Sequence, residues 1–196
     1  MAAGSITIGV LALQGAFAKH IHMLRVLNVS AKEVRYPRDL EGCDALIIPG
    51  GESTTIMRQI QYIGLRDPLI VFAKTKPVFG TCAGLILISS EIIHGMMTPF
   101  GLIEISVERN AFGRQVESFQ ADVELRLAKD CAQNFPAVFI RAPRIRQAHS
   151  NVQVLARYKD EPILVRQGNH LGATFHPELT DDPSIHLYFL DLVRKH

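Results

Sequence analysis

A cysteine set between small residues is the first candidate for chemistry in this chain. Cys82 lies in the pentapeptide GTCAG at 80–84, after the apolar stretch Val78–Phe79 and before the apolar run Leu85–Ile88. A strand that turns sharply into a helix through small residues presents one side chain in a strained, exposed pose. At a helix N-terminus, free amides and the dipole favour thiolate over thiol. The segment predicts a nucleophilic cysteine; a structural cysteine buried between glycines is the alternative.

A base for such a nucleophile is found near the end of the chain, in the tripeptide His-Pro-Glu. His176 could accept the thiol proton, and Glu178 could fix the tautomer of the imidazole. Pro177 disfavours helical backbone at the residue before it, so we expect an extended tripeptide in which His176 and Glu178 project to the same side. Taken alone, the tripeptide could be a surface turn. The order Cys, His, Glu along the chain favours a catalytic triad.

A third segment, IIPGGESTT at 47–55, could stabilise negative charge on a reacting substrate. Its apolar start predicts a strand, and Ser53 or Thr54 could cap a following helix. Glycine lets the backbone come close to a ligand and point an N–H at it. The amide near Gly51, with that of Ala83 after the cysteine, is what a developing oxyanion needs. A simple strand-to-helix turn is the alternative, and a phosphate-binding loop is disfavoured because its lysine is missing.

The composition is that of an ordinary globular chain and excludes several function classes. With 196 residues, of which 47% are hydrophobic and 20% charged, we expect a single domain over residues 1–196 with a sizeable core. A net charge of +2 and the lack of a basic, aromatic-interleaved patch give no reason to expect nucleic-acid binding. The longest apolar runs are too short to span a bilayer, so no membrane association is expected.

Cysteine usage and the amino terminus bear on the compartment. Residues 1–5 lack a positive region followed by an apolar stretch, so we expect no signal peptide. The three cysteines, Cys43, Cys82 and Cys131, are an odd number at unrelated spacings, which argues against a disulfide framework. We therefore expect a cytoplasmic protein in which Cys43 and Cys131 are ordinary thiols.

The first half of the chain alternates strand and helix signals. Ile6–Leu13 is a near-continuous apolar run suited to a strand covered on both faces. Gly15–Leu27 then carries apolar residues at helical spacing. This rhythm predicts a mostly parallel sheet with helices on both faces. Further strands are expected at Ala31–Tyr36, Ala45–Ile48 and Val78–Phe79, and helices at Thr54–Ile63, Asp67–Lys74 and Leu85–Ile88.

From about Leu102 the pattern changes to short strand candidates, which would extend the sheet or form an antiparallel layer beside it. An amphipathic helix is expected at Pro183–Arg194. Ligands of such a sheet bind at the carboxyl ends of its strands, where the Pro49–Ser53 turn and the Cys82 turn both fall. The strand candidates are Ile103–Val107, Phe119–Leu127, Val138–Ile140, Val152–Tyr158, Ile163–Arg166 and Ala173–Phe175.

Further segments complete the pattern: GVLALQG at 9–15, PGGESTT at 49–55, ERNAFGRQ at 108–115 and FIRAP at 139–143. With GTCAG and the final HPEL, they resemble class I, triad-type glutamine amidotransferases. More narrowly, they are similar to the glutaminase subunits of pyridoxal 5′-phosphate synthases. The cysteine and His-Pro-Glu motifs indicate the superfamily, whereas ERNAFGRQ and FIRAP carry the narrower resemblance, which spans nearly the whole chain.

The resemblance implies a three-layer, flavodoxin-like α/β fold with a mostly parallel sheet, helices on both faces and an additional antiparallel strand region. It implies Cys82 as nucleophile, His176 as base and Glu178 as the residue that orients the base. An arginine fork suits the α-carboxylate of glutamine, although without the resemblance such arginines would be read as surface ion-pair residues. The implied glutamine-binding residues are Gly51, Glu52, Ser53, Arg109, Ile140 and Arg141.

The implied reaction is hydrolysis of the L-glutamine side-chain amide to glutamate and ammonia through a γ-glutamyl thioester. The implied partner is a pyridoxal 5′-phosphate synthase subunit that accepts the ammonia within a hetero-oligomer. No cofactor and no metal are implied. Gln14 and Gly15 either line the rim near that partner or simply end the first strand. Lys19 replaces a glutamate that is common in the family, a departure that concerns partner contact rather than chemistry.

Three other interpretations remain open. A glutaminase of another amidotransferase, such as imidazole glycerol phosphate synthase, would share the triad but should lack FIRAP. A related cysteine hydrolase would have the cysteine turn without Gly-Glu-Ser and the arginines. A binding module without catalytic activity should have lost Cys82, His176 or Glu178, and all three are present. These three residues could also ligate a metal by type, but no closely spaced Cys or His pair supports such a site.

Overall fold

A parallel half-sheet forms the centre of the molecule. The computed structural model describes residues 6–109, 118–128 and 131–196. Five strands run parallel in the order β2-β1-β3-β4-β12, and their buried positions are almost entirely apolar because helices cover both faces. These strands are β1 (Thr7–Leu11), β2 (Ser30–Val34), β3 (Ala45–Ile48), β4 (Val78–Thr81) and β12 (His170–Ala173).

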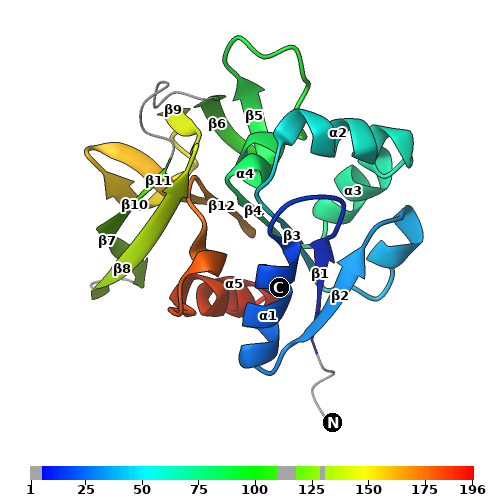
Figure 1. Ribbon diagram of the computed structural model, residues 1–196, viewed down its shortest axis with the longest axis horizontal. Helices are drawn as coiled ribbons and strands as arrows, with labels where there is room; N and C mark the ends of the chain where they lie inside the picture. The colour runs from blue at the N-terminus through cyan, green and yellow to red at the C-terminus, as the bar shows by residue number, and fades with distance from the viewer. Residues whose placement is uncertain (1–5, 110–117, 129–130) are drawn as a thin grey trace.

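Helices cover both faces of this half-sheet (Figure 1). Along β3 the side chains alternate between two separate cores: Ala45 and Ile47 pack with one pair of helices, Leu46 and Ile48 with the other group. The three-layer α/β prediction is therefore confirmed. One face carries α1 (Phe17–Val26) and α5 (Ser184–Arg194); the other carries α2 (Ser53–Tyr62), α3 (Arg66–Ala73) and α4 (Ala83–Ile88).

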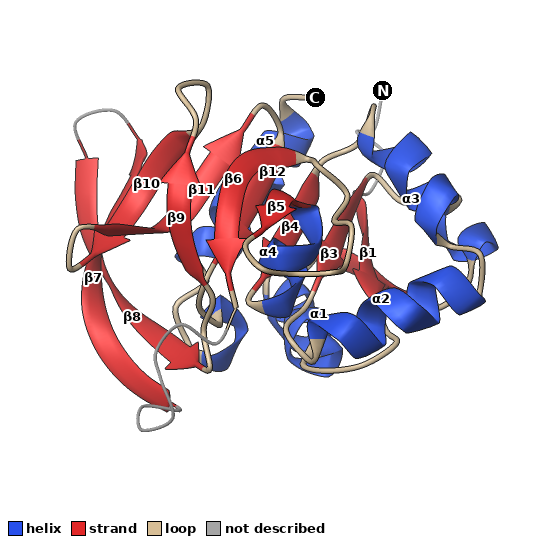
Figure 2. Ribbon diagram, turned by 90° about the horizontal axis from the view of Figure 1, so that it is seen from above, coloured by secondary structure: helices blue, strands red, loops and turns tan. Residues whose placement is uncertain are grey.

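An antiparallel region extends the sheet beyond β12, as predicted. The order continues β12-β11-β10-β7-β8 with every pairing antiparallel, and a separate three-stranded sheet, β5-β6-β9, lies beside it (Figure 2). Both arrangements that the sequence allowed are therefore present: some of the short strands extend the large sheet, and others form a second sheet beside it. The strands are β5 (Ser89–Ile92), β6 (Ile103–Glu108), β7 (Ser118–Ala128), β8 (Cys131–Ile140), β9 (Arg144–Ala148), β10 (Gln153–Tyr158) and β11 (Glu161–Gln167).

Several strands differ from their predicted positions. Two strands, β5 and β9, were not predicted, because β5 has only four residues and β9 carries two exposed or half-exposed arginines and a glutamine on a short, mostly polar stretch. The strand β8 begins seven residues before the predicted Val138 and includes Pro136; β8 is the last strand of the sheet, where a missing N–H is tolerated. The last parallel strand covers His170–Ala173 rather than Ala173–Phe175.

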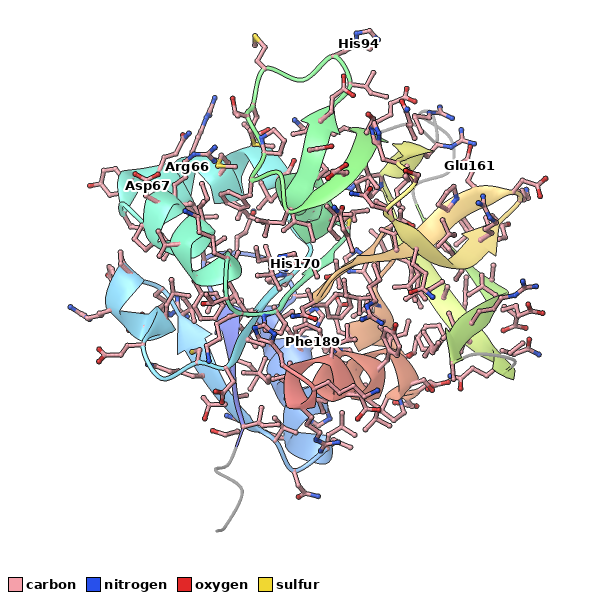
Figure 3. All side chains as sticks on the ribbon, turned by 180° about the vertical axis from the view of Figure 1, so that it is seen from behind. Arg66, Asp67, His94, Glu161, His170 and Phe189 are labelled. Atoms are coloured by element: carbon pink, nitrogen blue, oxygen red, sulfur yellow. The ribbon has the colours of Figure 1, made fainter. Side chains whose placement is uncertain are left out.

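Aromatic side chains fill the space between β4 and the helices of the α1 and α5 face. The ring of Phe79 lies 5.4 Å from that of Phe189 and 6.0 Å from that of His186, centroid to centroid. Phe189, which is fully buried, is labelled in Figure 3 on α5 where this helix meets the sheet. Rings in tilted or edge-on contact hold β4 and α5 in a fixed relation.

Part of the sequence pattern lies outside the described residues. This applies to positions 110–115 of the ERNAFGRQ segment, to residues 1–5 and to the side chain of Cys131. Within the described ranges, no helix is long and apolar enough to cross a membrane.

Candidate active site

The cysteine turn has the predicted backbone but a less exposed side chain than expected. Cys82 follows β4 directly and is the N-cap of α4, with φ 49° and ψ −104°, a strained region for a residue with a Cβ. Only 7% of the residue is exposed. Its amide donates to the Ala173 carbonyl at 2.8 Å, and its Sγ lies 3.8 Å from the Ile140 carbonyl oxygen. The thiol therefore opens into a pocket rather than into bulk solvent.

Two glycines make this turn possible through close approach. A Cβ added to Gly84 would lie 1.9 Å from the carbonyl oxygen of Ile48, so only glycine lets α4 pack against the end of β3. A Cβ added to Gly50 would lie 2.4 Å from Cε1 of His176 and 3.3 Å from Cβ of Cys82. The turn after β3 is thus pressed directly against the candidate nucleophile and base.

The His-Pro-Glu tripeptide is not extended, contrary to the prediction. His176 has φ −110° and ψ 84°, and Pro177–Leu179 form a 3-10 turn, because proline is well suited to the first position of a helical turn. The turn nevertheless brings the side chains together, with His176 Nδ1 2.7 Å from Glu178 Oε1. The amide of His176 donates to the Val138 carbonyl at 2.8 Å, which fixes the residue against β8.

The electrostatics of the three residues favour an ionised pair. Burial alone would lower the pKa of His176, but hydrogen bonds to Cys82 and Glu178 and the negative charge of Glu178 outweigh it and raise the pKa to about 10. Burial alone would raise the pKa of Glu178, but the nearby histidines His20 and His176 lower it. Glu178 is therefore a carboxylate near neutral pH, and His176 holds a proton between it and the sulfur.

A buried polar cluster behind Glu178 was missed by the sequence analysis. His20 on α1 is fully buried, and its Nε2 lies 3.4 Å from Glu178 Oε2 and 3.2 Å from Thr81 Oγ1. On the other side of the ring, His20 Nδ1 lies 3.0 Å from Nε2 of His186 on α5. The only available signal was a pair of histidines at positions that otherwise follow the apolar faces of two helices.

A pocket of about 230 Å³ opens beside Cys82 and brings together nearly all the predicted site residues. Glu178 lies behind His176 and does not line it. Three lining residues, Ala16, Ile86 and Leu179, were not among the predicted set, although Leu179 belongs to the HPEL motif. The predicted residues that line the pocket are Gly51, Glu52, Ser53, Cys82, Ala83, Arg109, Ile140, Arg141 and His176.

Glu52 joins the loop after β3 to the second sheet. Its carboxylate, rather than Ser53 or Thr54 as predicted, caps α2 by accepting hydrogen bonds from the amides of Thr54 and Thr55 at 3.1 and 2.7 Å. Partial burial would raise the pKa of Glu52, but the hydrogen bonds from Thr55 and Thr54 lower it to about 2. The same carboxylate pairs with Arg109 Nη2 at 3.2 Å. The pocket wall is therefore charged on both sides.

The turn that carries Gly51 is anchored at its other end by the loop after β1. The amide of Glu52 donates to the side-chain oxygen of Gln14 at 3.0 Å, and the amide of Ala16 donates to the Gly50 carbonyl at 3.3 Å. Gln14 thus supports the candidate oxyanion-binding loop from the loop after β1, a strand that ends at Leu11.

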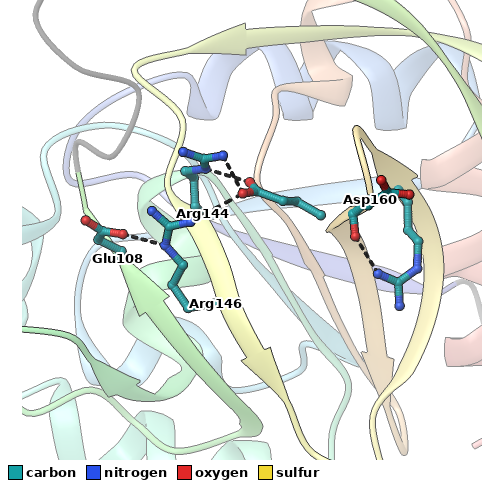
Figure 4. A network of polar contacts seen from close by, with 6 residues as sticks. Glu108, Arg144, Arg146 and Asp160 are labelled. Atoms are coloured by element: carbon teal, nitrogen blue, oxygen red, sulfur yellow. Dashed lines mark hydrogen bonds and ion pairs between the residues drawn. The ribbon is translucent and has the colours of Figure 1, made fainter.

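A charge network secures the strand that leads to Arg109 (Figure 4). Arg146 on β9 pairs with Glu108, the last residue of β6, and lies 3.3 Å from Glu161 on β11. Arg144 makes a two-pronged contact with the same Glu161. The network therefore links the three-stranded sheet to the large one directly beside the pocket.

The donor set of the site suits acyl transfer better than metal chemistry. Within residues 6–109, 118–128 and 131–196 there is no group of three or more His, Cys, Asp or Glu side chains that could hold a metal ion. A thiol, an imidazole held by a carboxylate, and amides at a helix start and a glycine turn are the parts needed to attack a carbonyl carbon and stabilise its oxyanion.

The sequence matches a known family over nearly its whole length. The model of the SNO glutamine amidotransferase family matches residues 10–195. Two curated relatives have the name "Pyridoxal 5'-phosphate synthase subunit PdxT". The one from Thermosipho africanus is 49% identical over 189 residues, covering 96% of this chain and 99% of the relative. The one from Thermus thermophilus is 50% identical over 188 residues, covering 94% and 96%.

Solved structures agree with the fold. A crystal structure of a glutamine amidotransferase superposes with a TM-score of 0.89 and 48% identity, covering 95% of this chain and 98% of the other. PurLQS from Thermotoga maritima superposes with a TM-score of 0.66 at 16% identity, covering 95% and 98%, and shows likeness of fold alone.

Proposed function

Because the chain belongs to the SNO glutamine amidotransferase family, we propose that it is the glutaminase subunit of a pyridoxal 5′-phosphate synthase. It hydrolyses the side-chain amide of L-glutamine to L-glutamate and ammonia. The observation that carries the proposal is that Cys82, His176 and all the implied glutamine-binding residues line one pocket. The relatives of 49% and 50% identity support the synthase assignment over other amidotransferases.

In the proposed first half-reaction, the Cys82 thiolate attacks the carboxamide carbon of glutamine. A C–S bond forms, and the carbonyl oxygen becomes an oxyanion held by the amides of Gly51 and Ala83. His176 then gives its proton to the nitrogen, the C–N bond breaks and ammonia leaves. The product is a γ-glutamyl thioester on Cys82.

In the second half-reaction, His176 removes a proton from water, which attacks the thioester carbon through a second oxyanion. The C–S bond breaks and glutamate is released, leaving sulfur as thiolate and His176 protonated. Glu178 orients the ring in both halves through the 2.7 Å contact with Nδ1. Each proton taken by His176 is returned, so the cycle needs no cofactor.

The charged residues of the pocket suit the α-carboxylate and the α-ammonium group of glutamine. Arg109 and Arg141 place cationic groups that can pair with the α-carboxylate, and Glu52 supplies a carboxylate for the α-ammonium. Ser53 and Ile140 also line the pocket. In the free protein, Glu52 and Arg109 neutralise each other across the opening.

The partner in this proposal is a synthase subunit that uses the ammonia to build pyridoxal 5′-phosphate within a hetero-oligomer. Ammonia is mostly protonated near neutral pH and then cannot act as a nucleophile, so it must travel along a shielded path. Residues 1–196 act as one glutaminase domain in the cytoplasm. Activity of the isolated subunit is low, because losing one oxyanion donor costs about 3–4 kcal/mol and the partner completes the Gly51 side of the site.

The decisive measurement is glutamate release from L-glutamine by the wild type and by Cys82→Ala, each with and without a pyridoxal 5′-phosphate synthase subunit. We expect activity only in the mixture of wild type and partner. Activity retained by Cys82→Ala contradicts the nucleophile assignment. Equal turnover with and without the partner contradicts activation by the partner, and turnover in neither mixture contradicts the synthase assignment.

A further inference from the structure

The second carboxylate oxygen of Glu178, Oε2, is buried on the side away from His176. Oε1 faces His176, whereas no described residue makes an ordinary hydrogen bond to Oε2, and His20 Nε2 lies 3.4 Å from it. The Glu178 side chain has no exposed surface. A buried ionised oxygen without a donor is costly, so the proton on the His20 ring decides whether Glu178 can stay charged in this place.

A neutral His20 can carry its proton on either of its two ring nitrogens. If the proton is on Nδ1, that atom donates to His186 Nε2, and the bare Nε2 of His20 presents a lone pair to Glu178 Oε2. The carboxylate oxygen then has no donor. His186, whose Nε2 accepts in this arrangement, must carry its own proton on Nδ1, an atom that finds no partner among the described residues. Both a buried anion and a buried N–H are left unsatisfied.

The other tautomer removes the buried unpaired N–H and turns a donor toward the anion. With the proton on Nε2, His20 donates toward Glu178 Oε2, with Thr81 Oγ1 at 3.2 Å as a second acceptor. The Nδ1 atom of His20 then accepts from the Nε2–H of His186 at 3.0 Å. The lone pair of His186 Nδ1 remains without a partner, and a neutral acceptor is the cheapest of these groups to bury. Glu178 Oε2 faces an N–H at 3.4 Å, a contact longer than an ordinary hydrogen bond.

Burial supports the neutral state of both rings. Removal from water lowers the pKa of His20, with Glu178 acting in the opposite direction. It lowers the pKa of His186 to about 3. Neither ring is therefore an imidazolium near neutral pH, and the 3.4 Å contact joins a neutral ring nitrogen of His20 to the Glu178 carboxylate.

We propose that His20 is a positioning residue of the glutaminase reaction, donating its Nε2–H to Glu178 Oε2 while His186 fixes its tautomer from behind. The polar contacts then form a relay: His186 donates to His20, His20 donates toward Glu178, and Glu178 holds the ring of His176. The inference rests on the proposed role of Glu178 as the orienter of His176. Without His20, the carboxylate is free to rotate and has a higher affinity for a proton.

Packing against Phe79 holds the rings of His20 and His186 in place. His20 and His186 come from α1 and α5 on the same face of the sheet, and both rings contact the ring of Phe79 edge-on, with centroids 6.3 and 6.0 Å away. Phe79 lies on β4, three residues before Cys82. His20 and His186 therefore lie on the side of Glu178 opposite His176.

The test compares three variants in the complete enzyme with its synthase partner. His20→Leu keeps the bulk and removes the donor; His20→Gln keeps an N–H donor at a similar reach. Leu24→Ala, fully buried on the same helix, is the matched control for lost packing. In His20→Leu, kcat should fall about 10- to 100-fold with KM little changed. The acidic limb of the pH–activity profile of this variant should move to higher pH, because Glu178 loses the donor that favours the charged form of its carboxyl group.

The other two variants separate positioning from packing. His20→Gln should recover kcat to within about fivefold of the wild type with the acid limb unmoved. Leu24→Ala should lose stability while keeping the wild-type pH profile per folded molecule. A His20→Leu enzyme that matches Leu24→Ala in pH profile and in activity per folded molecule overturns the proposal.

Nitrogen-15 NMR of histidine-labelled wild type gives a readout that needs no variant to fold. We expect His20 to carry its proton on Nε2, and the opposite tautomer overturns the proposal. Failure of the triad itself would show differently, as activity retained by Cys82→Ala. The tautomer of His20 can thus be decided whether or not the triad assignment holds.

Discussion

His176 and Glu178 meet across a single proline: Nδ1 of the one lies 2.7 Å from Oε1 of the other, inside a 3-10 turn. So short a connection leaves little freedom for either side chain to be displaced independently. The carboxylate and the imidazole are therefore expected to move as one unit beside Cys82.

The alkaline limit of activity should report on this unit. The pKa of His176 is raised to about 10 despite burial, so kcat/KM should show no inflection near 6.5 and should fall only as the pH approaches 10. Glu178→Gln removes the charge and weakens the hydrogen bond, so the imidazolium becomes less stable and the alkaline limb should move toward 6.5. Asp181→Asn makes the same charge change at a nearby exposed position and should leave the limb in place.

Gly50→Ala should inactivate the enzyme through a steric route. The new methyl would lie 2.4 Å from His176 Cε1, so the ring must move. A displacement of about 1 Å at reacting groups lowers rates on the order of 100-fold. Gly42→Ala, which meets nothing within 4 Å, is the control. It should cost about 1 kcal/mol through its φ of 75° but keep its activity. Normal turnover by Gly50→Ala contradicts the site geometry.

Acid should destabilise the fold through the buried histidine of α5. Burial lowers the pKa of His186 to about 3, whereas the unfolded chain takes up this proton near 6.5. The stabilisation is thus complete above 6.5 and is lost as the pH falls from 6.5 toward 3, at up to about 1.4 kcal/mol per pH unit. Urea unfolding of His186→Gln between pH 5 and 7 should show a shallower pH dependence than the wild type.

The matched control for this measurement is His22→Gln, an exposed histidine on α1. It should reproduce the wild-type slope of unfolding free energy against pH. If His186→Gln and His22→Gln give the same slope, the acid sensitivity of the fold has another origin.

The charge network beside the pocket should contribute measurably to stability. Glu161 pairs with Arg144 and Arg146 and has only 26% of its side chain exposed. Glu161→Gln should lower the free energy of unfolding by about 1 kcal/mol, less at high salt. Glu124→Gln breaks the pair with Arg126, whose side chains are 53% and 75% exposed, and should change stability by a few tenths of a kcal/mol at most, about the noise of the method. Equal effects of the two changes would show that the network adds nothing.

The parallel half of the fold was predictable because its signals are local. The apolar stretches at 45–48 and 78–79 are buried on both faces, and every helix between them carries its own apolar spacing. The same holds for the cysteine turn, whose small residues are needed by the backbone itself. Most site residues were reached through family motifs, and the structure places nine of them around one pocket.

The rest depends on contacts between distant parts of the chain, which no local pattern carries. Strand β9 pairs Arg144 and Arg146 with acidic residues of other strands, so its sequence reads as polar loop. His20 follows an apolar helical face and becomes a polar partner only because Glu178, 158 positions later, folds against it. The extended His-Pro-Glu prediction was wrong because proline also starts a helical turn readily.

The pocket lies where the two sheets meet, and each sheet contributes different residues to it. The residues proposed as nucleophile and base follow strands of the nine-stranded sheet, whereas Arg109 directly follows β6 in the three-stranded one. The residues proposed for catalysis and most of those proposed to bind glutamine therefore lie on or after strands of the nine-stranded sheet, and the three-stranded sheet contributes Arg109 alone among them. A change in the smaller sheet can therefore alter how the charged end of the substrate is held while Cys82 and His176 stay in place, so this architecture lets substrate choice vary while the proposed chemistry is kept.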